Sequence, residues 1–273
     1  MKKRVISAAV MVALLVVLFV LPKSISHIGI AVAVGLLAAQ SYRDLLGLKE
    51  SRKDYPKYIN VLGFICLELM VFHRTMVPLT AFSGVNFMVI GLVLLTLLIP
   101  SIFDKKGEYT TKEAFYLAGT TIMVGLFFNL IMLVYNINRW ELLYLLAIAT
   151  MTDTFAMLIG CLIGKHKLIP DVSPKKSIEG SIGGSVVGTI IASIFYYNVI
   201  SNNINIFILI LMTLALTVLG QLGDLFFSKI KRENKIKDFS NIMPGHGGIL
   251  DRFDSLSFIV LGYIVIINLI NLF

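Results

Sequence analysis

Long apolar runs separated by short charged loops constrain the fold of this 273-residue chain more than any other feature. A membrane-spanning helix needs about 20 mostly apolar residues, because all its backbone hydrogen bonds must be made within the segment. Nine helices are expected, over residues 5–21, 28–48, 61–72, 85–103, 115–135, 142–164, 182–200, 204–227 and 256–273. Charged residues are only 15% of the chain, against about 25% in soluble domains. The sequence therefore predicts an all-α, polytopic integral membrane protein with about nine transmembrane helices.

The basic residues predict how these helices are oriented, because cytoplasmic loops carry an excess of Lys and Arg. If the N-terminus is cytoplasmic, only Lys23, Arg74 and Arg139 of the 24 basic residues fall on the outer side. The first run follows a basic flank, as in a signal peptide. No small-residue cleavage site follows that run, so we expect a retained helix. We therefore expect a cell-membrane protein whose polar loops at 165–176 and 229–252 face the cytoplasm.

The net charge of +8 also bears on partners. In a membrane protein such a charge indicates loops that face anionic lipid, so no nucleic-acid partner is expected. Cys66 and Cys161 lie inside apolar runs without metal-ligand spacing, which is typical of buried free thiols. We expect one membrane domain over 1–273, with about five helices in 1–140 and the chemistry-bearing motifs in 141–273.

A highly polar stretch lies between the last two apolar runs. Asp224 and Ser228 are four residues apart, so on a helix they share a face, with Lys231 one turn further on. A Pro-Gly-His-Gly-Gly turn then allows close backbone approach to a ligand and precedes a helix, whose N-terminus favours anions such as phosphate. Asp251 and Asp254 follow three residues apart and can hold a hard cation. These features indicate metal-dependent phosphoryl or nucleotidyl transfer.

Carboxylates inside apolar runs are further candidates for chemistry. A charged side chain in a membrane helix costs about 3 kcal/mol on insertion scales, so it is a functional candidate by default. By this criterion Asp153 and Asp224 are candidate site residues. Glu68 has no motif around it, so helix-packing hydrogen bonds and a function are both open for it.

The segment from Ser173 to Gly180 reads SPKKSIEG and combines a turn with charge. Its Lys175 and Lys176 offer ammonium groups suited to a polyphosphate, and Glu179 can orient one of them or a nucleotide. A solvated loop against lipid headgroups is the alternative. The glycines between 160 and 188 are spaced in a way that favours close helix packing.

Both polar segments resemble the signature of phosphatidate cytidylyltransferases, the enzymes that make CDP-diacylglycerol. In the C-terminal segment the matching residues are Ser228, Lys231, Arg232, Lys237, Asp238, Pro244, His246, Gly247, Gly248, Asp251, Arg252 and Asp254. Upstream they are Asp153, the GKHKLIP run at 164–170, Ser173, Pro174, Lys176, Ser177, Glu179 and Gly180. There are two departures: Met157 stands where members commonly have Tyr, and Met243 where they have Leu, Ile or Phe.

The resemblance implies that CTP and phosphatidate, a membrane lipid, react to give CDP-diacylglycerol and pyrophosphate with Mg²⁺ as cofactor. It assigns catalysis to Asp224, Asp251, Asp254 and Lys231, and Mg²⁺ binding to Asp224 and Asp251. It implies substrate binding by Asp153, Lys175, Lys176, Glu179, Ser228, Arg232, Lys237, His246, Gly247, Gly248 and Arg252. A second, monovalent cation and a homodimer are left open. For His246, a general-base role and a role in the turn or at a phosphate are both open.

Two other functions fit parts of the pattern. A membrane transferase that moves a phosphosugar onto a polyprenyl phosphate also needs cytoplasmic Asp clusters and Mg²⁺, but the PGHGGILDRFD sequence argues against it. A transporter that uses Asp153 and Asp224 as ion sites would have its polar residues in the middle of the membrane, not at one face. Cytidylyl transfer to phosphatidate is therefore the preferred hypothesis.

Overall fold

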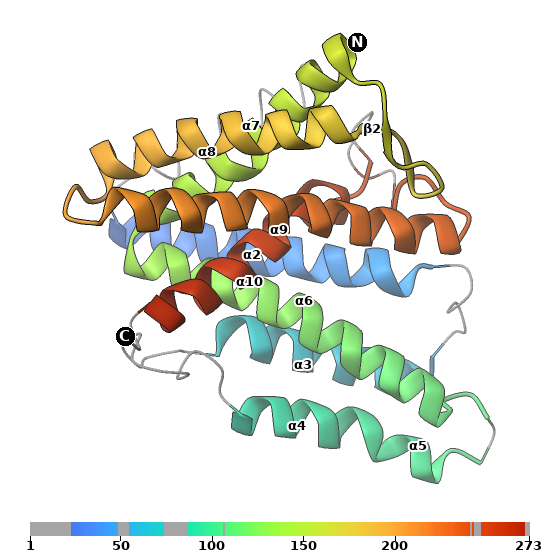
Figure 1. Ribbon diagram of the computed structural model, residues 1–273. Coiled ribbons are helices and arrows are strands. Elements are labelled where there is room, and N and C mark those ends of the chain that lie inside the picture. Colours follow the sequence, from blue (N-terminus) through green and yellow to red (C-terminus); the bar gives the residue numbers. More distant parts are fainter. Residues whose placement is uncertain are drawn as a thin grey trace. The chain divides into compact units, whose positions relative to one another are not determined.

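The computed structural model describes residues 23–48, 55–73, 87–105, 107–240, 242 and 247–270. The described part is helical apart from turns, loops and one short β-hairpin (Figure 1). The chain divides into two compact units, one of residues 1–133 with 238–251 and the other of 134–237 with 252–273. The first expected helix, at 5–21, lies outside the described residues.

The first unit is built on helices α2 (Lys23–Leu46), α3 (Lys57–Phe72), α4 (Phe87–Leu98), α5 (Pro100–Phe103) and most of α6 (Thr111–Ile137). The expected helix at 85–103 is thus two helices, because Pro100 cannot continue a helix and instead begins α5. Helix α3 packs against α2 and α4. Asn129 of α6 caps the carboxyl end of α3, since its Nδ2 donates to Val71 O at 3.1 Å and to His73 O at 3.0 Å.

The second unit contains α7 (Arg139–Ile163), the antiparallel hairpin of β1 (Lys167–Ile169) and β2 (Ser173–Ser177), α8 (Ile178–Val199), α9 (Ile206–Glu233) and most of α10 (Leu250–Ile270). Helices α7, α8 and α9 each begin at a polar side chain that accepts a backbone N–H of the first turn. These caps are Asn138, Ser177 and Asn205. The hairpin was not expected from the sequence, and its second strand leads Lys176 directly into α8.

Helices α7 and α8 lie side by side in the second unit (Figure 1). The face of α8 that meets α7 carries Gly180, Gly184 and Gly188. A Cβ atom at position 184 would lie 2.6 Å from Thr152 O of α7, so glycine allows the two backbones to approach. The opposite face of α8 is exposed and aliphatic, with Ile182, Val186, Ile190 and Ile194. The close packing expected from the glycine spacing is confirmed, and the other face suits lipid.

Six helices of the described part are long and apolar enough to cross a membrane. They are His27–Leu46, Thr111–Ile137, Arg139–Ile163, Ile178–Val199, Ile206–Glu233 and Leu250–Ile270. The apolar segment Phe87–Phe103 and helix α3 are shorter. An almost all-helical, multi-pass membrane protein is therefore confirmed, while the count of nine helices and the side of the N-terminus stay predictions. Two helices extend into the polar segment that was expected to separate them: α9 continues past residue 227 to Glu233, and α10 begins at Leu250 instead of 256.

Candidate active site

An ion pair between β2 and α9 forms the centre of the candidate site in the second unit. Lys176 Nζ, near the end of β2, contacts Asp224 Oδ2 on α9. On the same helix face, Ser228 Oγ donates to Asp224 Oδ1 at 3.4 Å, as the four-residue spacing predicts. The side chains of Lys176 and Asp224 are 26% and 22% exposed, so the pair is accessible to a ligand.

Two more carboxylates lie near this pair. Asp153 of α7 accepts from Ser255 Oγ of α10 at 3.2 Å. Asp153 and Asp254 both interact electrostatically with Asp224. Lys231, a buried residue of α9, supplies opposite charge to Asp254. The second unit thus brings three carboxylates and two lysines together from β2, α7, α9 and α10.

Close packing of helices holds these side chains in place. A Cβ atom in place of the Gly223 hydrogen would lie 2.7 Å from Asp254 O, so this glycine lets α10 approach α9. Nearby on α9, the buried Gln221 Nε2 donates to Ser185 Oγ at 2.7 Å and to Ser181 O at 3.1 Å. This amide joins α9 to α8, and the sequence did not single it out because no motif surrounds it.

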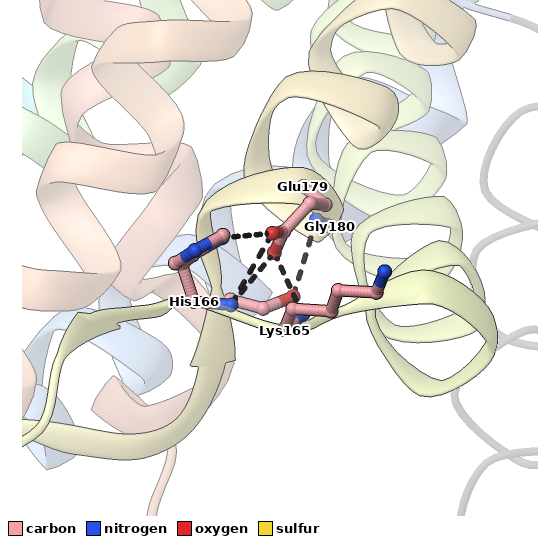
Figure 2. Close-up of polar contacts among 5 residues, drawn as sticks. Lys165, His166, Glu179 and Gly180 are labelled. Carbon is pink, nitrogen blue, oxygen red and sulfur yellow. Dashed lines mark hydrogen bonds and ion pairs between the residues drawn. The ribbon is translucent and has the colours of Figure 1, made fainter.

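Glu179, in the first turn of α8, points to the loop between α7 and β1 (Figure 2). Its carboxylate accepts from Lys165 N at 3.1 Å and from His166 N at 3.2 Å, and it lies 2.6 Å from His166 Nδ1. These bonds close the loop against the start of α8, where the helix dipole also favours a carboxylate. Glu179 therefore has a structural role here, and its expected contact with a lysine or nucleotide stays a prediction.

The remaining basic residues lie near the hairpin and the end of α9. Arg232 donates from Nε to Val172 O at 3.3 Å and from Nη1 to Ile236 O at 3.2 Å. Arg232 thereby ties the hairpin turn to the segment after α9, which is a structural role beside the expected phosphate contact. Lys175 and Lys237 are exposed, so their ammonium groups are accessible to a phosphate.

The glycine turn and Asp251 belong to the first unit. Gly247 has a φ of +82°, a conformation that side chains rarely adopt. Asp251 Oδ2 accepts from Gly248 N and from Phe239 N, both at 2.9 Å. The carboxylate thus binds the turn that precedes α10, and the helix begins directly after the turn, as expected.

His246 and Arg252 are two further predicted residues, and Asp44 is a polar residue that was not predicted. His246 lies outside the described residues, so both of its roles stay open, and Arg252 is exposed in the first turn of α10. Asp44, near the end of α2, is a carboxylate with only 3% exposure that the motifs did not include. The signal was present, because Asp44 is an ionisable residue in an apolar run, like Asp153 and Asp224.

Carboxylate oxygens are suitable ligands for Mg²⁺, but the described carboxylates do not by themselves make up a complete set of metal ligands. Mg²⁺ prefers oxygen ligands and binds through one or two carboxylates, waters and substrate phosphates. Among the described residues, no three His, Cys, Asp or Glu side chains converge as metal ligands. The donor set therefore suits an ion that arrives with a substrate phosphate, and the assignment of Asp224 and Asp251 as its ligands, which the resemblance implies, stays a prediction.

Comparisons with known proteins agree with these features. The sequence pattern of the cytidylyltransferase family matches residues 2–270. The chain is 34% identical to the phosphatidate cytidylyltransferase of Staphylococcus haemolyticus over 228 residues, which is 82% of this chain and 84% of the relative. It is 36% identical to that of Bacillus subtilis over 181 residues, 65% and 67% of the two chains. It is 33% identical to that of Staphylococcus aureus over 264 residues, 95% and 96% of the two chains.

Proposed function

Because this chain belongs to the cytidylyltransferase family, we propose that it transfers the cytidylyl group of CTP to phosphatidate, giving CDP-diacylglycerol and pyrophosphate. The observation that carries the proposal is the cluster of acidic and basic side chains in the second unit: Asp153, Asp224, Asp254, Lys176 and Lys231. Its ammonium groups suit a polyphosphate, and its carboxylates suit Mg²⁺. The apolar helices suit a substrate that stays in the bilayer.

The reaction needs little acid–base help from the protein. The phosphate of phosphatidate is already an anion, and one of its oxygens attacks the α-phosphorus of CTP. The bond from that phosphorus to the bridging oxygen breaks, and pyrophosphate leaves with the electron pair. Catalysis therefore rests on positioning and on charge neutralisation. Lys176 and Lys231 neutralise phosphate charge, and Mg²⁺, when bound, supplies further neutralisation of the phosphate oxygens.

Product analysis with the purified protein tests this proposal. With CTP labelled in its cytosine ring, phosphatidate and Mg²⁺, the expected result is label in chloroform-extractable lipid and an equal amount of pyrophosphate. Removal of Mg²⁺ with a chelator should stop both. A polyprenyl-phosphate sugar transferase would leave CTP unused, and a transporter would move solute without forming either product. Each of these outcomes would overturn the proposal.

We also propose that the N-terminus and the segment after α9 face the cytoplasm, where CTP is available. In that orientation all but three of the 24 basic residues lie on the cytoplasmic side. Lys235, in the turn after α9, is exposed and offers a position at which to test the orientation.

The variant Lys235→Cys, with Cys66 and Cys161 replaced by Ala, is expected to resist an impermeant thiol reagent added to intact cells. It should be labelled once the cells are permeabilised. Asn203→Cys is the matched control, because the α8–α9 loop is expected on the outer side and should be labelled in intact cells. Labelling of the cysteine at 235 in intact cells would show that the proposed orientation is wrong.

A further inference from the structure

Asp44 is a buried carboxylate outside the sequence motifs, and it contacts the glycine turn of the first unit. It lies near the end of α2 and is 3% exposed. Gln40, one helical turn earlier, donates from Nε2 to Asp44 Oδ1 at 2.9 Å. Because a buried charge is costly unless it is hydrogen-bonded, the second oxygen of this carboxylate also needs a partner.

The second oxygen faces the backbone at the start of α10. Leu250 N donates to Asp44 Oδ2 at 3.5 Å, which is a long hydrogen bond. A Cβ atom at position 248 would lie 2.7 Å from the same oxygen, so glycine is what leaves room for the carboxylate. The N-terminus of a helix also favours a nearby negative charge. The Asp44 carboxylate therefore has room beside the turn and interacts favourably with the N-terminus of the helix that follows it.

Asp251 holds the same segment through its own hydrogen bonds. Its Oδ2 accepts from Gly248 N and from Phe239 N at 2.9 Å. Gly248 thus donates to Asp251 of α10, and its lack of a side chain leaves room for the Asp44 carboxylate of α2, which accepts from Leu250 N. Carboxylates that bind a metal are themselves oriented by hydrogen-bonded neighbours, and loss of those neighbours weakens the site. For Asp251, the amide of Gly248 is such a neighbour.

We propose that Asp44 is a positioning residue: it holds Gly248 and the first turn of α10, and so orients the Asp251 carboxylate toward Mg²⁺ and the CTP phosphates. The inference rests on the proposed function, in which Asp251 acts at the polyphosphate. Asp44 contacts the protein backbone, so it acts through Asp251 and not on the substrate. It gives α2, in the N-terminal half of the chain, a part in the site.

Hydrogen exchange followed by mass spectrometry tests the contact without any substrate. In Asp44→Asn, which keeps the size of the side chain and removes its charge, amides at 247–251 should exchange about tenfold faster, because a bond to a charged acceptor is lost. Asp104→Asn is the matched control. Asp104 also accepts a backbone N–H, from Tyr109 at 2.6 Å, but in another loop. Exchange at 247–251 should not change in this control.

Kinetics test the positioning role. Asp44→Asn is expected to lower kcat/KM for CTP about 10- to 100-fold, while the KM for phosphatidate and the thermal midpoint stay unchanged. Gln40→Leu removes the bond that orients Asp44 and should shift exchange and kcat/KM in the same direction. This second variant keeps the proposal testable if Asp44→Asn does not fold.

Unchanged hydrogen exchange at 247–251 in both variants would contradict the claim that Asp44 holds this turn. Equal losses for CTP and phosphatidate, with a lower thermal midpoint, would mean that Asp44 serves general packing and would overturn the positioning role. A protein that makes no CDP-diacylglycerol would instead contradict the proposed function, and the exchange measurement would still decide whether Asp44 holds the turn.

Discussion

Replacing Asp224 with Asn is expected to lower the rate of cytidylyl transfer about a hundredfold or more. Asp224 pairs with Lys176 and accepts from Ser228, and its proposed task is to hold Mg²⁺ against the CTP phosphates. Asn keeps the size of the side chain, so the fold should survive while the charge is lost. The measurement is the steady-state rate over a Mg²⁺ titration. Asp171→Asn, in the exposed hairpin turn, is the matched control and should leave the rate unchanged.

The same measurement on Asp251→Asn tests whether the two carboxylates serve one ion. If they do, the double variant Asp224→Asn/Asp251→Asn should be little slower than either single variant, because groups that act as a unit are not additive. Losses that multiply in the double variant would indicate two independent roles. Near-normal activity in either single variant would remove that residue from the proposed metal site.

Lys176→Met should raise the KM for CTP about 10- to 100-fold and change the KM for phosphatidate little. The Lys176 ammonium is assigned to the polyphosphate, and the loss of a hydrogen bond to a charged group costs about 1.5–3 kcal/mol. Met keeps most of the aliphatic length, so packing around β2 should survive. Initial rates at varied CTP and fixed phosphatidate, and the reverse, separate the two KM values.

Two further variants test whether this effect depends on the positive charge at position 176. Lys176→Arg retains the positive charge and should recover part of the lost affinity, although a guanidinium does not reproduce the geometry of an ammonium. Lys167→Met removes an exposed lysine of the neighbouring strand and should leave both KM values unchanged. A normal KM for CTP in Lys176→Met would contradict the assignment of this lysine to the nucleotide.

The helices and several contacts within them could be predicted from the sequence, because hydropathy and spacing are local properties. Residues four apart share a face of any α-helix. Hence Ser228 meets Asp224 on α9, and Gly180 and Gly184 form one packing face on α8. The turn before α10 was also predictable, since Gly247 supplies the positive φ that the turn requires.

The sequence by itself determined the apolar helices, the polar segments and the family to which the chain belongs. Only the tertiary structure paired Lys176 with Asp224, Asp153 with Ser255, Gln221 with Ser185 and Asp44 with Leu250. It also made a strand of the segment that carries Lys176, because a strand forms only where a partner strand pairs with it. No spacing rule relates such residues. Each buried polar group needs a partner, and that partner is set by which helix faces pack together across the whole chain.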